Sequence, residues 1–481
     1  TPAQVQGWPH IVGGDHTLIC APTGSGKTLT AFLASIDRLV TTPRPAERTH
    51  RTRVLYISPL RALAFDVEKN LRAPLTGIGF AAERAGLAFT EPEVAMRTGD
   101  TPSNERQKLI RRPPDLLITT PESLYLMLTS SAAETLRGVE TVIIDEIHAM
   151  ATTKRGAHLA LSLERLHEVA DRAPQRIGLS ATQRPLDEIA RFLGGYDDAG
   201  SARPVRIVDA GISKPLDVEV IVPVDDMGAP GDTTTPLGQP GGGERRSSIW
   251  PSIYPRVLEL VLAHRSTIIF CNARRSAERL AAKLNELYEE AHGEPDDDRS
   301  DDRSDELVKA HHGSLAREQR VVIEDQLKRG ELRAIVATSS LELGIDMGAV
   351  DLVIQIESPG AVSRGLQRIG RAGHHVGEPS KGTIFPKHRG DLIEAAVVTR
   401  RMIDGEIEHS RYLRNPLDVL AQQIVAHAAA RDELAVDDLT RLVRRCANFH
   451  DISDELLRNV LDLLAGRYPS EEFSELRPRL V

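Results

Sequence analysis

The chain has 481 residues, of which 27% are charged and 41% hydrophobic, and its formal net charge is −9 at pH 7. This composition is typical of globular proteins, and the length allows two to four domains. No apolar run approaches the ~20 residues of a transmembrane helix, and the three cysteines are scattered without a CxxC pair. We therefore expect a soluble, cytoplasmic protein without disulfides or a zinc site. Because residue 1 is Thr, we expect a fragment of a longer protein.

A Gly-rich segment, APTGSGKT at residues 21–28, lies between an apolar strand predicted at 16–20 and an amphipathic helix. This strand–loop–helix context is the one in which phosphate-binding loops occur. The glycines let the backbone approach an anion, Lys27 reaches the terminal phosphates, and Thr28 supplies a hydroxyl to Mg²⁺. An ordinary Gly-rich turn is the alternative, because Ala21 replaces the first glycine of the motif. The residues expected at the phosphates are Thr23, Gly24, Ser25, Gly26, Lys27 and Thr28.

Two adjacent acids, Asp145 and Glu146, follow an apolar run that predicts a buried strand. Unpaired carboxylates at such a position are unfavourable, so a purely structural explanation is poor. Hydrolysis of a nucleoside triphosphate needs one carboxylate to hold Mg²⁺ through its water shell and another to orient and deprotonate water. The pair therefore supports the assignment of the phosphate loop.

Further apolar runs predict strands at 53–57, 116–118, 176–180, 267–271, 333–337 and 351–356. Several of them end in hydroxyl or Arg residues, including Arg61 and Thr120. In a parallel sheet these side chains gather at the carboxyl edge, where ligands bind. Helix capping would explain Thr120 equally well, but the repetition favours contacts with phosphates.

An arginine motif at residues 367–374, QRIGRAGH, follows the last of these strands. We expect a helix here, so that Arg368 and Arg371, three residues apart, share one face. A surface salt-bridge pair is one interpretation. Arginine fingers that stabilise charge on a γ-phosphate are the other, and a second nucleotide-type sheet favours them.

The chain divides by pattern into three segments: residues 1–203, residues 204–405 and residues 406–481. Residues near 200–224 are expected to connect to the stretch that follows them. A Gly/Pro/Thr-rich stretch at 225–248 predicts a flexible insertion, and 293–306 an acidic loop that carries much of the negative charge. The third segment has three apolar stripes, at 419–425, 439–446 and 456–464, which fit a truncated winged-helix domain or a plain helical bundle.

Taken together, the motifs resemble those of superfamily 2 helicases, most closely the large helicase-related (Lhr) family. The motifs that stand in that family's order are TPAQ, APTGSGKT, SPLRAL, TTPESL, DEIH, SAT, IIFCNARRSAE, HHGSL, ATSSLELGID and QRIGRAGH. WPSIYPR at 250–256 and NPLDVLAQQIVA at 415–426 look like Lhr rather than DEAD-box proteins. The resemblance implies an α/β fold of two tandem RecA-like parallel-sheet domains with ATP between them, followed by a mostly helical winged-helix domain.

The resemblance also implies an activity. It is ATP-dependent 3′-to-5′ translocation on single-stranded DNA with Mg²⁺ as cofactor, and unwinding of DNA or RNA:DNA hybrids by a monomeric motor in DNA repair. An RNA-remodelling ATPase of the DEAD-box type is the alternative, although DEIH and the winged helix argue against it. A non-enzymatic, nucleotide-gated binding module is a further alternative, and the intact catalytic motifs argue against that.

Residue by residue, the resemblance implies that Gln4 reads adenine, Asp145 holds the metal's water and Glu146 is the general base. Gly344 and Asp346 lie near the nucleotide. Side chains that grip the strand backbone would be Arg61, Thr120, Asn272 and Thr338.

The same resemblance implies that His148 couples hydrolysis to the strand, together with residues 180–182. Arg371, with Arg368, is the expected finger. His374 departs from the family pattern, because many relatives carry Arg there, and its role stays open.

Overall fold

The computed structural model describes residues 1–22, 24–181, 183–211, 215–227, 248–292, 306–342, 347–348, 350–373, 378–467 and 478–480. The chain forms two compact units. The first comprises Thr1–Gly211 together with His409–Val481, and the second comprises Ile212–Glu408. The expected acidic loop and most of the expected flexible insertion lie outside the described residues.

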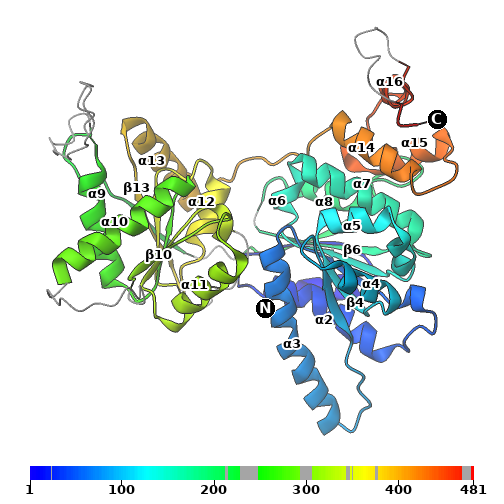
Figure 1. Ribbon diagram of the computed structural model, residues 1–481, viewed down its shortest axis with the longest axis horizontal. Coiled ribbons are helices and arrows are strands. Elements are labelled where there is room, and N and C mark those ends of the chain that lie inside the picture. The colour runs from blue at the N-terminus through cyan, green and yellow to red at the C-terminus, as the bar shows by residue number, and fades with distance from the viewer. Residues whose placement is uncertain are drawn as a thin grey trace. The chain divides into compact units, whose positions relative to one another are not determined.

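Within the described residues, the first unit contains a seven-stranded parallel sheet in the order β3-β4-β2-β5-β6-β1-β7. Its strands are β1 (His16–Cys20), β2 (Val54–Ile57), β3 (Val94–Arg97), β4 (Leu116–Thr119), β5 (Thr141–Ile144), β6 (Gln175–Ser180) and β7 (Val205–Asp209). Strands β2, β4, β5 and β6 are buried throughout because helices cover both faces (Figure 1). All carboxyl ends therefore lie at one edge.

The helices of residues 1–211 are α1 (Pro2–Val12), α2 (Lys27–Thr41), α3 (Arg61–Arg84), α4 (Ser103–Arg111), α5 (Pro121–Leu128), α6 (His148–Ala151), α7 (Lys154–Val169) and α8 (Leu186–Gly194). Short 3₁₀ turns lie at Arg48–His50 and Ser131–Leu136. Buried side chains of α1, α2 and α3 form one hydrophobic core with the sheet. Those of α5, α6, α7 and α8 form a second core on its other face.

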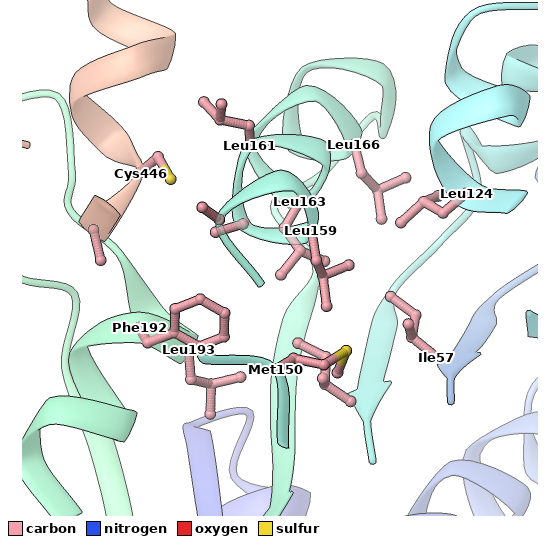
Figure 2. Close-up of a cluster of buried hydrophobic side chains, with 14 of the residues drawn as sticks. Ile57, Leu124, Met150, Leu159, Leu161, Leu163, Leu166, Phe192, Leu193 and Cys446 are labelled. Carbon is pink, nitrogen blue, oxygen red and sulfur yellow. The ribbon is translucent and has the colours of Figure 1, made fainter. Parts of the chain in front are cut away.

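The C-terminal residues add α14 (Leu417–Ala428), α15 (Val436–Arg445), a 3₁₀ turn at Ala447–Phe449 and α16 (Asp454–Leu464). These confirm the three helices expected from the apolar stripes. They share the core of α7, whose side chains are buried nearly all round. Figure 2 shows α7 residues Leu159, Leu161 and Leu163 in the same cluster as Phe192 of α8 and Cys446. The C-terminal helices thus pack against α7 and α8 within the first unit.

The second unit is built on a parallel sheet in the order β10-β11-β9-β12-β13-β8, six strands within the described residues. Its strands are β8 (Leu216–Val220), β9 (Thr267–Phe270), β10 (Val308–His311), β11 (Ala334–Ala337), β12 (Leu352–Ile356) and β13 (Ser380–Phe385). Its helices are α9 (Trp250–Ala263), α10 (Arg274–His292), α11 (Arg317–Arg329), α12 (Val362–Ile369) and α13 (Arg389–Asp404), with a 3₁₀ turn at Ser339–Leu341. The expected α/β class with two parallel sheets is confirmed.

The region 200–224 differs from its expected role as a connection, because it contributes a strand to each sheet. β7 pairs with β1, so the first sheet continues past residue 203. β8 pairs with β13 in the second sheet. Both are edge strands, and β8 is nowhere fully buried, which explains why they lack the continuous apolar runs of the central strands.

Candidate nucleotide and nucleic-acid site

The phosphate loop joins β1 to α2 at the carboxyl edge of the first sheet. Gly24 and Gly26 adopt φ of 79° and 86°, a left-handed backbone that other residues rarely take. Lys27 begins α2, is only 7% exposed, and donates from Nζ to the Ala21 carbonyl at 2.8 Å. The Ala21 amide donates to the Ser180 carbonyl at 3.1 Å. The loop is therefore formed and tied to β6 with its lysine held inside, while Thr23 lies outside the described residues.

The start of α1 lies against this loop. Thr1 and Gln4 form a capping box, in which the Gln4 side-chain oxygen accepts from the Thr1 amino group at 2.8 Å. A Cβ on Gly26 would lie 3.2 Å from Gln4 Nε2, so the amide sits beside the loop. Ser25 donates from its hydroxyl to the Pro22 carbonyl at 2.7 Å. The TPAQ motif and the phosphate loop are thus brought together.

The two acids lie directly beyond β5, two strands from the loop in the same sheet. Asp145 is 3% exposed and Glu146 6% exposed. Tyr56 of β2 donates its hydroxyl to Asp145 Oδ2, and the Glu146 amide donates to Asp145 Oδ1 at 2.9 Å. Burial, and then the negative charge of Glu146, raise the pKa of Asp145, whereas the nearby charge of Lys27 lowers it. The carboxylates and the lysine therefore form one electrostatic unit.

Backbone strain marks the same position. Glu146 has a φ of +44°, which is uncommon for a residue with a side chain. The strained residue lies between β5 and α6, so the turn that it makes sends the two carboxylates to the sheet edge.

His148 connects the acids to the end of β6. Its Nδ1 accepts from the Ala181 amide at 3.2 Å and lies 3.3 Å from Ser180 Oγ and 3.5 Å from Glu146 Oε2. Burial lowers the pKa of His148, so the ring is neutral at pH 7. The side chain of His148 thus links the DEIH motif to the SAT motif. Thr182, the last residue of SAT, lies outside the described residues.

The loops that follow β2 and β4 lead into α3 and α5, and the predicted strand-contact residues of this unit lie where these helices begin. Arg61 is exposed and pairs with Asp100. Thr120 is buried at the start of α5, where its hydroxyl donates to Ser123 Oγ at 3.2 Å. These contacts do not by themselves identify Arg61 or Thr120 as a strand contact.

Arg155, near the start of α7, joins these two loops, and the sequence reasoning missed it. Its guanidinium donates to both oxygens of Glu122, at 2.5 and 2.9 Å, and to the Pro59 carbonyl at 2.5 Å. Nothing in its sequence context, TTKRGAH, signals that contact, because both partners are distant in the chain.

In the second unit, Asn272 lies two residues after the end of β9, and Thr338 directly follows β11. The Asn272 side chain donates to the Ser358 carbonyl at 2.9 Å. The Thr338 amide donates to the His311 carbonyl at 3.3 Å. They lie at the carboxyl ends of neighbouring strands, as expected, whereas Gly344, Asp346 and His374 lie outside the described residues.

The arginine motif is arranged differently from the expectation. Helix α12 ends at Ile369, so the interpretation that Arg368 and Arg371 share a helical face is wrong. Gly370 and Gly373 follow, and the Arg371 amide donates to the Arg368 carbonyl at 3.1 Å in the turn after the helix. Arg368 is 3% exposed and bound to acceptors of its own unit. Arg371 donates from Nη2 to the Glu342 carbonyl at 2.8 Å.

The donor set near the phosphate loop fits Mg²⁺ rather than zinc. Asp145 offers a carboxylate and Thr28 a hydroxyl, and Mg²⁺ commonly takes one or two protein oxygens plus waters and substrate phosphates. Among the described residues, no group of three or more His, Cys, Asp or Glu is placed to hold a metal by itself. Within that same part of the chain, no helix has the length and apolar character to cross a membrane.

Three family models match the chain. Residues 1–189 match the DEAD/DEAH box helicase model, 253–375 the helicase conserved C-terminal domain, and 400–481 the winged-helix domain of large helicase-related proteins.

Individual relatives agree with these matches. The chain is 53% identical, over its whole length and 32% of the relative, to the Lhr helicase/probable uracil glycosylase of Mycolicibacterium smegmatis. It is 41% identical to the ATP-dependent helicase Lhr-Core protein 2 of Thermococcus barophilus, over 98% of this chain and 51% of the relative. The chain thus spans about half or less of each of these two relatives.

Among solved structures, the Mycobacterium smegmatis helicase Lhr bound to ssDNA and AMP-PNP superposes with a TM-score of 0.85. Its sequence identity to this chain is 53%, and the match covers 99% of this chain and 56% of that one. The three family-model matches follow one another along the chain, and the relatives named above are Lhr helicases. The chain therefore belongs to the Lhr family of helicases.

Proposed function

We propose that the chain is an ATP-dependent motor that translocates 3′ to 5′ on single-stranded DNA and unwinds DNA or RNA:DNA duplexes. The observation that carries this proposal is the arrangement in the first unit. There, the phosphate-loop lysine and the buried Asp145–Glu146 pair meet at the edge of one parallel sheet. A role in DNA repair, a monomeric state and a cytoplasmic location belong to the same proposal.

ATP is the proposed substrate. Lys27 and the loop amides bind its β- and γ-phosphates, residues 23–26 wrap the anion, and the Gln4 amide reads adenine. Thr28 and Asp145 would hold Mg²⁺, Asp145 partly through water, and the ion would neutralise charge that develops on the phosphates. Gly344 and Asp346 complete the nucleotide environment in this proposal.

Hydrolysis is an in-line displacement at the γ-phosphorus. A water oxygen forms the new bond as the bond to the β–γ bridging oxygen breaks and ADP leaves. Glu146 accepts the proton from that water, and Arg371 is the proposed arginine finger for the charge on the γ-phosphoryl oxygens. His148 holds the end of β6 against DEIH, through the Ala181 amide, and so links turnover to the SAT segment.

Single-stranded DNA is the proposed partner. The Mycobacterium smegmatis helicase Lhr was solved with ssDNA and AMP-PNP, and this chain is 53% identical to it. Arg61 and Thr120 in the first unit, with Asn272 and Thr338 in the second, are the proposed contacts to the strand backbone. RNA:DNA hybrid is the proposed duplex substrate.

The Glu146→Gln variant tests the enzymatic part of this proposal. Glutamine keeps the size and hydrogen-bonding capacity of the side chain but does not accept the proton. We expect ATP and single-stranded DNA to bind with near wild-type affinity, while turnover falls by about 10²-fold or more. Binding is measured with a fluorescent ATP analogue and a labelled oligonucleotide, and turnover by phosphate release. If Glu146→Gln hydrolysed ATP at the wild-type rate, Glu146 would not be the general base. If the wild-type chain bound both ligands without turnover, a nucleotide-gated binding module would be the better description.

A further inference from the structure

Arg368 makes more polar contacts than an arginine held ready for a phosphate would make. Its Nε donates to Glu342 Oε1 at 2.8 Å, and its Nη2 donates to the same oxygen. Its Nη1 donates to Asn272 Oδ1 at 3.0 Å and to Gln355 Oε1 at 2.8 Å. The side chain is 3% exposed. All three nitrogens of the guanidinium are therefore occupied by acceptors inside the second unit.

A flat face of the same guanidinium packs against an aromatic ring. The guanidinium carbon lies 5.2 Å from the centre of the Phe270 ring, the last residue of β9. Burial lowers the pKa of Arg368, but the charge of Glu342 raises it again, so the guanidinium stays ionised. A buried cation of this kind is retained only where its partners are held in place with it.

Glu342 is the first of the two connections that Arg368 makes. It follows the 3₁₀ turn at Ser339–Leu341, directly after the predicted strand contact Thr338. Its carboxylate accepts from Arg368, and its backbone carbonyl accepts from Arg371 Nη2 at 2.8 Å. The two arginines of the motif thus converge on one residue, Arg368 through the carboxylate and Arg371 through the main chain.

Asn272 is the second connection. Its side-chain oxygen accepts from Arg368, while its nitrogen donates to the Ser358 carbonyl at 2.9 Å and to Glu357 Oε2 at 3.2 Å. The amide of this predicted strand contact is therefore fixed in orientation by Arg368. Arg368 therefore contacts both Asn272, which would touch the DNA backbone, and Glu342, whose carbonyl binds the proposed finger Arg371.

We propose that Arg368 is a positioning residue, rather than an arginine finger, which joins Asn272 to Arg371 through Glu342 and so transmits strand binding to ATP turnover. The proposal rests on the proposed function of the chain. A lysine cannot replace the arginine. The planar guanidinium reaches three acceptors on separate segments, whereas a single ammonium group cannot.

The test compares Arg368→Lys, Glu342→Gln and the double variant by ATP hydrolysis with and without single-stranded DNA. We expect each single variant to lower the ratio of DNA-stimulated to basal kcat by about tenfold, because coupling between two sites is typically worth that much. We also expect the DNA concentration for half-maximal stimulation to rise, while ATP affinity without DNA is unchanged. Because both residues act in one network, the double variant should lose no more than about twofold beyond the worse single variant.

A finger would give a different result. If Arg368 contacted the γ-phosphate directly, Arg368→Lys would lower basal and stimulated kcat alike without changing the DNA requirement. Its effect would then multiply with that of Glu342→Gln. Either result overturns the proposal. So does an Arg368→Lys variant that unfolds at lower temperature yet is stimulated by DNA like the wild type, since that would be a purely structural role.

Arg400→Ala is the matched control, because Arg400 is an exposed arginine of α13 in the same unit and forms its ion pair with Asp404 of the same helix, at 2.6 Å. We expect it to behave as the wild type in every readout. A wild-type chain with no DNA stimulation would overturn the proposed function and this inference together. A stimulated wild type with equally stimulated Arg368→Lys overturns this inference alone.

Discussion

Gly156, the third residue of α7, shows how tightly the DEIH segment is packed. A Cβ at this position would lie 2.1 Å from the Met150 carbonyl oxygen, which belongs to the preceding helix α6. No side chain fits there unless the backbone between His148 and Arg155 shifts. We expect Gly156→Ala to lower the free energy of unfolding by about 1–3 kcal/mol, as overpacking does, measured by urea denaturation.

Gly77→Ala is the control for this substitution. Gly77 lies inside α3, and a Cβ there would meet nothing within 4 Å. Because alanine favours helix more than glycine does, we expect Gly77→Ala to raise the free energy of unfolding by up to about 1 kcal/mol. Equal effects of the two substitutions would mean that the α6–α7 turn is not constrained as the structure indicates.

At the scale of residues, the sequence predicts those features that are determined by residues adjacent in the chain. The phosphate loop and the acid pair could be found because their glycines, lysine and carboxylates follow apolar strands directly. The environment of Arg368 could not be predicted, because its acceptors come from three distant segments, represented by Asn272, Glu342 and Gln355. Tyr56 was missed for the same reason, since its contact with Asp145 depends on the order of strands in the sheet.

At the scale of elements, Arg155 connects α7 to the loops after β2 and β4. The helix begins shortly after His148, and Arg155 near its start binds Glu122 and the Pro59 carbonyl, so a short stretch of chain connects the DEIH acids to both partners. We expect Arg155→Ala to retain basal ATP hydrolysis but to raise the DNA concentration for half-maximal stimulation by about tenfold, because the two loops lose their common anchor. ATPase titrations with single-stranded DNA measure this concentration.

Arg72→Ala serves as the comparison. Arg72 forms an exposed pair with Glu68 at 2.9 Å on α3, a type of interaction that contributes little. A normal DNA titration in both variants would show that Arg155 does not link the loops to turnover.

Burial explains which strands could be predicted from the sequence. The central strands are continuous apolar runs because helices cover both faces, and their predicted positions agree with β1, β2, β4, β5, β6, β9, β11 and β12 to within one or two residues. β7 and β8 lie at sheet edges and expose residues along their length, and β3 is only partly buried, so their apolar patterns are weak. β10 and β13 carry polar residues such as Lys309 and Lys381, which interrupt the apolar run.

At the scale of the whole molecule, a buried charge cluster helps to hold the C-terminal helices against residues 1–211 within the first unit. Glu164 of α7 is 1% exposed and lies 2.9 Å from Arg176 of β6 and 2.8 Å from Arg203. Arg445 of α15 lies 3.4 Å from Glu164 and 3.0 Å from Glu168. The apolar stripes predicted the C-terminal helices, but not the surface on which they pack, because Glu164 and Arg445 are far apart in the sequence.

This cluster predicts a specific pH dependence of stability. Burial alone would raise the pKa of Glu164, but Arg176 and Arg203 outweigh it and lower the pKa to about 2, from 4.5. Since the folded-state value is the lower one, the stabilisation is complete above about pH 4.5 and is lost as the pH falls toward 2. It amounts to about 3 kcal/mol at 1.36 kcal/mol per pKa unit, of which about half is lost by pH 3.5.

The measurement is urea denaturation between pH 6 and 3.5. We expect Glu164→Gln to be less stable at pH 6 and to lose less stability than the wild type as the pH falls. Glu105→Gln is the control, because Glu105 lies on exposed α4 with its partner Lys108 at 3.7 Å. Identical pH slopes for the wild type and Glu164→Gln would contradict the assignment of the cluster.

The most direct test of the motor assignment is steady-state ATP hydrolysis by the chain without nucleic acid, with single-stranded DNA and with single-stranded RNA. Lys27→Ala serves as the blank, because Lys27 is the buried cation of the phosphate loop. We predict strong stimulation by DNA, little by RNA, and loss of turnover in Lys27→Ala under every condition. Equal or greater stimulation by RNA would contradict the DNA motor and favour the RNA-remodelling alternative, and turnover that survives in Lys27→Ala would contradict the site itself.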